Sequence, residues 1–123
     1  MIDHMTFRVN DIEKSKNFYT PVLATLGYQV AFDEHFEGIR ILGFGKNGKI
    51  DTWFVNSKPA GGHTHIAWLA SSKEEVDAFH KAAIAAGGVD NGSPGPRPHY
   101  HANYYGAFVL DPDNNNVEAV YRG

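Results

Sequence analysis

The stretch Thr64–Trp68 reads THIAW and places a histidine inside an otherwise apolar strand pattern. Side chains of a β-strand alternate between its two faces, so Ile66 and Trp68 are expected on one face and His65 on the other. A buried imidazole needs partners for both ring nitrogens, so a histidine at such a position requires a chemical reason. The stretch therefore predicts a strand that packs one face on a helix and carries His65 on the opposite face.

The same arrangement occurs near the amino terminus. Ile2–Val9 alternates, with apolar residues on one face and His4, Thr6 and Arg8 on the other. A carboxylate, Glu118, lies in a third strand-like run, NVEAV. Two imidazoles and one carboxylate suit Zn, Fe(II), Mn, Ni or Co, so these three side chains predict a metal site. The alternative is two hydrogen-bonded core histidines and a solvated carboxylate.

Each histidine-bearing strand is followed by a helix and by further strands. In the first half the sequence predicts a helix that begins at Asp11, breaks at Pro21 and ends at Gly27. Three strands follow, at residues 28–33, 39–44 and 50–55. In the second half a capping box, Ser72 with Glu75, begins a helix that ends at Gly87. After it we expect a weak edge strand near Val89, a loop over residues 91–98, and a hairpin of strands 104–110 and 116–121.

The two halves also agree in spacing. His4 to Phe18 and His65 to Phe79 both span 14 positions. An internal repeat of one βαβββ unit explains this, with modules at about 1–57 and 63–123 and a linker at residues 58–62, KPAGG. We expect one α+β domain over residues 1–123, with a cup-shaped cleft of mixed sheets and the helices on its outer face.

Composition narrows the possible partners. The 123 residues, 42% hydrophobic and 13% aromatic, are typical of one folded domain. The net charge is −3 and no basic block occurs, so neither nucleic acid nor a membrane surface is an expected partner. There is no cysteine, no apolar run of membrane-spanning length and no leader pattern, so we expect a cytoplasmic protein.

Further residues are candidates for the walls and proton transfers of the cleft. Asp51, in the last strand of the first module, is a possible fourth ligand or base, although Trp53 competes for the inward position. The irregular segment Pro96–Tyr105 supplies donors, stacking faces and a possible proton carrier. Its candidate residues are His99, Tyr100, His101, Tyr104 and Tyr105, and Thr6, Arg8, Trp53 and Phe108 are expected to line the cleft.

One tempting motif is better explained as a turn. Asp111-x-Asp113-x-Asn115 looks like the start of a calcium-binding loop. The twelfth position of such a loop is a bidentate glutamate, and here it is Arg122. We therefore expect DPDNNN to connect the two strands of the final hairpin.

Three segments carry a resemblance to a known family. The segments DHMTFRVNDIEKSKNFYTPVLATLGY, THIAW and AFVLDPDNNNVEAV resemble the vicinal oxygen chelate superfamily, which contains glyoxalase I, extradiol dioxygenases and bleomycin- and fosfomycin-resistance proteins. The resemblance implies paired βαβββ modules around a cup-shaped cleft, commonly completed as a homodimer. It also implies metal ligands at the positions of His4, His65 and Glu118.

The resemblance implies a metal-dependent, glyoxalase-like lyase, isomerase or small dioxygenase that acts on a small molecule with vicinal oxygens. Its divalent ion would be Zn, Ni, Co, Mn or Fe. The alternative is a metal-free protein that sequesters a small molecule, as in antibiotic resistance. Glyoxalase I uses a fourth ligand, normally glutamate, where this chain offers Asp51, and extradiol dioxygenases generally have four modules. The reaction is therefore not fixed by the fold alone.

Overall fold

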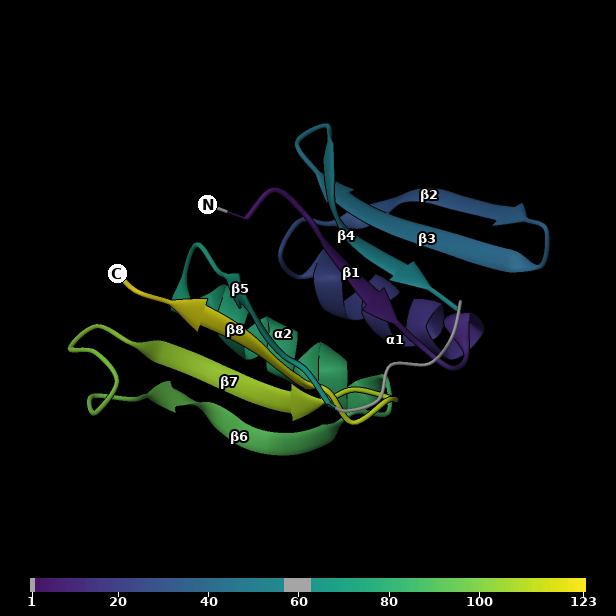
Figure 1. Cartoon of the computed structure of the whole chain (residues 1–123). Coiled ribbons are helices and arrows are strands. Elements are labelled where there is room, and N and C mark those ends of the chain that lie inside the picture. The colour runs from purple at the N-terminus through teal and green to yellow at the C-terminus, as the bar shows by residue number, and fades with distance from the viewer. Residues whose placement is uncertain (1, 57–62) are drawn as a thin grey trace.

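The computed structural model describes residues 2–56 and 63–123 and contains two similar halves (Figure 1). The predicted linker at 58–62 lies outside the described residues. The first half comprises β1 (Met5–Arg8), α1 (Ile12–Ala24), β2 (Gln29–Phe36), β3 (Ile39–Lys46) and β4 (Lys49–Val55). The second comprises β5 (His65–Leu69), α2 (Lys73–Ala85), β6 (Val89–Pro96), β7 (Tyr105–Leu110) and β8 (Asn116–Tyr121). The predicted α+β class with two βαβββ modules is confirmed.

The two halves repeat the same strand order and register. Each forms a four-stranded mixed sheet, in the orders β1-β4-β3-β2 and β5-β8-β7-β6. The first strand of each sheet pairs in parallel with the last, and the other pairs are antiparallel. Thr6 is opposite Trp53 in one sheet, and Ala67 is opposite Glu118 in the other. Thr6 and Ala67 each lie two residues after a histidine, so Trp53 and Glu118 occupy equivalent positions.

One hydrophobic core joins the two halves. Both helices lie behind the sheets in Figure 1. The buried apolar side chains of the strands and of both helices belong to one cluster. The ring of Tyr19 in α1 lies 6.2 Å from that of Trp68 in β5, and Trp68 lies 6.3 Å from Phe79 in α2. Burial of such large side chains against one another is the main stabilising term of a fold of this size. Within residues 2–56 and 63–123, no helix covers the other face of either sheet (Figure 1).

The turn between β7 and β8 ties the second half to the first. Asp111 is buried and accepts hydrogen bonds from the Tyr19 hydroxyl of α1 and from the backbone and side chain of Asn115. Asp113 accepts a hydrogen bond of 3.1 Å from the side chain of Asn10. The interpretation of DPDNNN as a turn is confirmed, and its carboxylates are used to join the halves.

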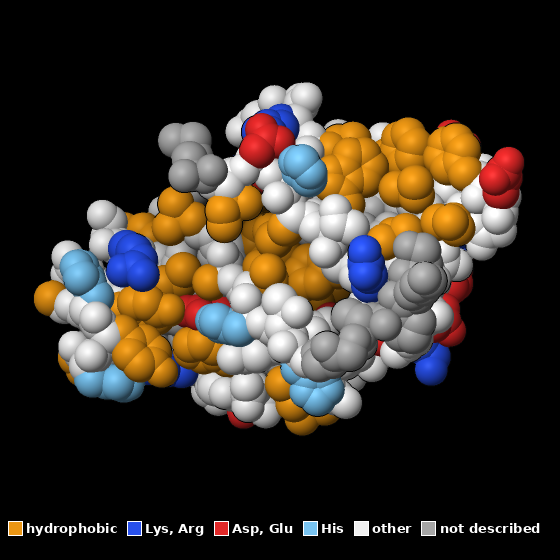
Figure 2. Space-filling model, viewed as in Figure 1, with side chains coloured by type: hydrophobic (Ala, Val, Ile, Leu, Met, Phe, Trp, Pro, Cys, Tyr) orange, Lys and Arg blue, Asp and Glu red, His pale blue; other side chains and the backbone are white. Residues whose placement is uncertain are grey.

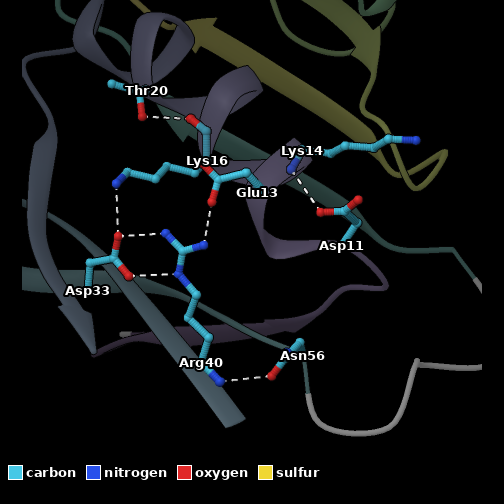
Figure 3. A network of polar contacts seen from close by, with 8 residues as sticks. All are labelled: Asp11, Glu13, Lys14, Lys16, Thr20, Asp33, Arg40 and Asn56. Atoms are coloured by element: carbon cyan, nitrogen blue, oxygen red, sulfur yellow. Dashed lines mark hydrogen bonds and ion pairs between the residues drawn. The ribbon is translucent and has the colours of Figure 1, made fainter. Parts of the chain in front are cut away.

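A charged network fixes the first helix to its own sheet (Figure 3). Asp11 begins α1 by accepting from the Lys14 amide. Asp33 of β2 accepts two hydrogen bonds of 2.8 Å from the Arg40 guanidinium and one of 2.8 Å from Lys16 of α1. These hydrogen bonds hold the pKa of the Asp33 carboxyl well below its ordinary value. Through Lys16 and Glu13, this network links α1 to Asp33 of β2 and Arg40 of β3.

Two expectations about local structure were wrong. The predicted break at Pro21 does not occur, because α1 is continuous through it. Pro21 and Asn17 both lie on the exposed side of the helix, so the Asn17 carbonyl that loses its partner faces water. The predicted loop at 91–98 is mostly strand, since β6 runs to Pro96. β6 is an edge strand with two register shifts, and such a strand tolerates proline and glycine.

In the described part of the chain, no helix has the length and apolar composition needed to cross a membrane.

Candidate functional site

The open faces of the two sheets carry the candidate residues. The alternation expected for the leading strands is confirmed, since Phe7 and Trp68 are buried in the core while Thr6 and His65 are exposed. Figure 2 views these open faces, with histidines at separate places and hydrophobic side chains between them. The predicted site is therefore built on strands and lies away from the helices.

His65 and Glu118 form the centre of the candidate site. Glu118 Oε2 lies 3.2 Å from His65 Nε2. His65 Nδ1 lies 3.0 Å from the carbonyl oxygen of Asn116, and a carbonyl only accepts, so Nδ1 carries a proton. In the neutral ring this leaves the lone pair of Nε2 aimed at Glu118. The parallel register of β5 and β8, in which His65 is opposite Asn116, creates this geometry.

Glu118 is buried at the floor of the open face. Its side chain is only 2% exposed, whereas that of His65 is 51% exposed. The Tyr104 hydroxyl donates a hydrogen bond to Oε1. Burial raises the pKa of the Glu118 carboxyl above its ordinary value, although the hydrogen bond from Tyr104 and the neighbouring His65 oppose that shift. Burial likewise raises the pKa of Tyr104 to about 12, helped by its hydrogen bond to Glu118.

The pair fits a divalent metal ion. Two lone-pair donors 3.2 Å apart repel each other unless a proton or a cation lies between them. Ligand atoms at about 2.0–2.2 Å from one ion are about 3.0–3.5 Å apart in octahedral or tetrahedral geometry. The separation of Nε2 and Oε2 falls in that range. The Nδ1 hydrogen bond to a backbone carbonyl is the usual arrangement around a metal-binding histidine.

His4 is not gathered into this pair. Its Nδ1 lies 2.8 Å from Asp3 Oδ1. His4 and His65 border one cavity of about 310 Å³, but across residues 2–56 and 63–123 no three His, Asp or Glu side chains converge closely enough to hold a metal ion. The predicted ligand set of His4, His65 and Glu118 therefore stays a prediction.

The position equivalent to Glu118 in the first sheet is Trp53. Asp51 lies two residues earlier, next to a register shift between β3 and β4. Asp51 accepts hydrogen bonds from the Tyr28 hydroxyl at 3.0 Å and from Thr52 at 2.9 Å. It also borders the cavity shared by the two histidines, so its role as a fourth ligand or base stays a prediction. The sequence predicted that Trp53 would compete with Asp51 for the inward position, and Trp53 does occupy the position equivalent to Glu118.

Trp53 forms part of an apolar wall on the first sheet. It borders a cavity of about 550 Å³ together with His4, Thr6 and Ile41. The Trp53 ring lies across Gly43, where an added Cβ would come within 2.7 Å of it. Arg8 borders a different cavity of about 440 Å³, between β1 and the start of β5.

Phe108 lies beside the histidine–carboxylate pair. It is opposite Glu118 in the pairing of β7 with β8. Its ring lies 6.1 Å from that of His65, and the Arg97 guanidinium lies 5.5 Å from its centre. Phe108 therefore forms one wall of the candidate site.

The segment after β6 places its aromatic residues unequally. His99, Tyr100 and His101 are exposed. His101 Nδ1 accepts from the Asn103 amide, so its Nε2 carries the proton in the neutral ring. Tyr104 reaches Glu118, whereas the Tyr105 hydroxyl donates to Asp77 of α2 at 2.7 Å, on the opposite side of the sheet.

Two positions of the candidate site were not anticipated from the sequence. Gly106 leaves space for the site, since a Cβ there would lie 3.0 Å from Tyr104 Cε1 and 3.1 Å from Glu118 Oε1. Asn116 fixes the orientation of the His65 ring through its backbone carbonyl. Gly106 could have been identified from the sequence as the glycine that follows Tyr104 and Tyr105. The contact of the Asn116 carbonyl could not, because any residue at position 116 has a backbone carbonyl.

Comparison with known proteins agrees with the fold and the repeat. Residues 1–119 match the family model described as the Glyoxalase/Bleomycin resistance protein/Dioxygenase superfamily. No curated protein matches the sequence. The crystal structure of a glyoxalase/bleomycin resistance protein from Albidiferax ferrireducens T118 is 32% identical, with a TM-score of 0.75 over 100% of this chain and 99% of that one.

Two more distant structures show the fold alone. A lactoylglutathione lyase from Agrobacterium tumefaciens is 18% identical, with a TM-score of 0.71 over 98% of this chain and 92% of that one. Glyoxalase I from Zea mays is 21% identical, with a TM-score of 0.72 over 98% of this chain and 45% of that one. On the match over residues 1–119 and the 32% identical structure, the chain belongs to the glyoxalase/bleomycin resistance protein/dioxygenase superfamily.

Proposed function

We propose that the chain is a metal-dependent, glyoxalase-like lyase, isomerase or small dioxygenase that acts on a small molecule with vicinal oxygens. Its ligands are His4, His65 and Glu118, and its ion is Zn, Ni, Co, Mn or Fe. The observation that carries the proposal is the pair of His65 Nε2 and Glu118 Oε2, 3.2 Å apart. The ring orientation is set by the backbone, so the lone pair is already aimed before any ion arrives.

The bound ion would supply Lewis-acid stabilisation of negative charge that develops on substrate oxygens. The protein would supply the surroundings of that charge. Phe108 and the buried position of Glu118 exclude water from one side of the site. Asp51 would accept the substrate proton, and His101 would donate a proton from its protonated Nε2.

We propose that a second copy of the chain supplies the third ligand, so that each site combines His65 and Glu118 of one copy with His4 of the other. Two exposed apolar side chains beside the shared cavity support this arrangement, Ile2 at 82% and Leu69 at 71% exposure. Covering exposed apolar side chains of this size with a partner lowers the free energy of the assembly. The cytoplasmic location expected from the sequence stays a prediction.

Metal content tests the ligand set. Protein purified without added metal is expected to hold close to one divalent ion per chain by elemental analysis. His65→Ala and Glu118→Ala are expected to lose it. His63→Ala is the matched control, because His63 is exposed and lies two residues before His65 in the chain. Equal metal content in all four proteins would refute the ligand assignment.

Mixing two inactive variants tests whether the site is shared. His4→Ala and His65→Ala each damage every site in their own homodimers. If ligands come from two copies, a mixed dimer contains one site with all three ligands and one with neither histidine. Unfolding the two variants together and refolding them is then expected to restore up to a quarter of the wild-type metal content, from half the dimers at one site each. No restoration would place all ligands in one chain.

A second candidate function is metal-free binding of a flat aromatic molecule. The observation that favours it is Trp53 at the position equivalent to Glu118, on the wall of a cavity of about 550 Å³. Aromatic faces of this kind bind flat apolar groups. Quenching of Trp53 fluorescence by aromatic compounds, unchanged by a chelator and absent in Trp53→Phe, would support this function. Loss of the quenching on chelation would instead tie the ligand to the metal.

A further inference from the structure

We propose that Tyr104 is a positioning residue for Glu118 and that it makes the segment between β6 and β7 part of the metal site. The inference rests on the proposed function. The Tyr104 hydroxyl donates to Glu118 Oε1, while the other oxygen, Oε2, faces His65. One oxygen of the carboxylate is therefore held by the protein, and the other is presented to the ion.

Tyr104 is itself held on several sides. Its amide donates to the His101 carbonyl at 3.2 Å, and its carbonyl accepts from the Arg97 amide at 2.9 Å. The Arg122 guanidinium lies 5.0 Å from the centre of its ring, and the Tyr100 ring meets it edge-on at 5.1 Å. These contacts fix the position of the Tyr104 hydroxyl. A residue that only filled space would not need its hydroxyl held in one place.

The neighbouring glycine keeps this geometry possible. Any Cβ at position 106 would lie 3.0 Å from the Tyr104 ring and 3.1 Å from Glu118 Oε1. The space between the tyrosine and the carboxylate is thus reserved for their hydrogen bond. With Oε1 held by Tyr104 across Gly106, Oε2 of Glu118 is directed to His65.

A carboxylate fixed in this way loses little freedom when it binds an ion. Without the hydroxyl, the Glu118 side chain loses the hydrogen bond that holds it, and its buried Oε1 has no other hydrogen-bond donor within residues 2–56 and 63–123. Loss of a hydrogen bond to a metal ligand typically weakens metal binding by about 10- to 100-fold. Tyr104→Phe is expected to produce a loss of that size while the ring and its packing remain.

The test compares two single-hydroxyl deletions. Tyr104→Phe and the control Tyr105→Phe remove the same atom from adjacent residues, but the Tyr105 hydroxyl contacts Asp77 on the helix side of the sheet. Zn²⁺ affinity is measured by competition with a chromophoric chelator, and the visible absorption of the Co²⁺-loaded protein reports the ligand geometry. Tyr104→Phe is expected to weaken Zn²⁺ binding by about 10- to 100-fold and to alter the Co²⁺ spectrum, whereas Tyr105→Phe leaves both unchanged.

A second variant guards against a folding defect. Gly106→Ala keeps both hydroxyls but crowds the contact, and it is expected to weaken Zn²⁺ binding as well. Thermal unfolding of the metal-free variants identifies any general loss of structure. If wild type binds Zn²⁺ and Tyr104→Phe binds it equally well, the positioning role is wrong and the proposed function stands. If wild type itself binds neither Zn²⁺ nor Co²⁺, the proposed function fails and this inference fails with it.

Discussion

Replacing Asp111 by alanine should destabilise the whole protein rather than one half. The buried carboxylate accepts from the Tyr19 hydroxyl, from the Asp113 amide at 2.9 Å, and from the Asn115 amide and side chain at 2.8 and 3.0 Å. Hydrogen bonds to a charged group contribute about 1.5–3 kcal/mol each, but water can reach part of this turn once the carboxylate is gone. We therefore expect a total loss of about 3–4 kcal/mol, which is a large fraction of the about 5–15 kcal/mol typical of a domain.

Urea unfolding and thermal unfolding, each followed by circular dichroism and tryptophan fluorescence, measure this loss. Asp111→Ala is expected to lower the melting temperature by about 10–20 °C, with a single transition by both signals. Tyr19→Phe removes one of the four hydrogen bonds and should cost about 1–2 kcal/mol. Millimolar Ca²⁺ should stabilise neither wild type nor variants, since the carboxylates are used in the turn. A loss below about 1 kcal/mol for Asp111→Ala, or two separate transitions, would refute the role given to this residue.

Three further perturbations test the fold. The pKa of Asp33 is lower in the folded protein than its ordinary value of 3.8, so its contribution to the free energy of unfolding is complete above pH 3.8 and is lost as the pH falls below it. Asp33→Asn should therefore cost about 1–2 kcal/mol at pH 7, and the difference in stability from wild type should shrink in acid titrations. Pro21→Ala restores a donor to the Asn17 carbonyl and should stabilise α1 by about 1 kcal/mol in urea unfolding, whereas reduced stability would show that the proline is needed. Gly43→Ala would bring a Cβ within 2.7 Å of Trp53, so a loss of about 1–3 kcal/mol and a shifted tryptophan emission are expected, and unchanged emission would contradict the close packing.

The repeat was predictable because the period of the strand pattern and the spacing to the helix are local properties. The alternation around His4 and His65 gave the correct faces, and the equal spacings gave the correct modules. β6 was predicted only near Val89 and its continuation to Pro96 was missed, because proline and glycine normally exclude a strand and only its edge position makes them acceptable. Pro21 was misjudged because the exposure of the Asn17 carbonyl depends on tertiary packing.

The candidate site was only partly predictable. The pairing of His65 with Glu118 follows from two alternating strands next to each other in one sheet. The hydrogen bond from Tyr104 depends on the course of the irregular segment before β7, which residue types do not determine. The space at Gly106 depends on what packs against β7. His4 does not join this pair within the described residues, and the proposal that a second copy supplies it concerns assembly, which the strand pattern of one chain does not predict.

The contacts of the β7–β8 turn also affect how the chain can fold. Tyr19 and Asp111 are separated by 92 positions, and Asn10 and Asp113 by 103. In a nascent chain, the hydrogen bonds that join α1 and Asn10 to this turn cannot form until residues 111–113 have emerged from the ribosome. Long-range closure of this kind slows folding, because loop entropy is lost before the contacts form. Removing the chain from Asp111 onward should therefore destabilise the first half, despite its complete βαβββ sequence.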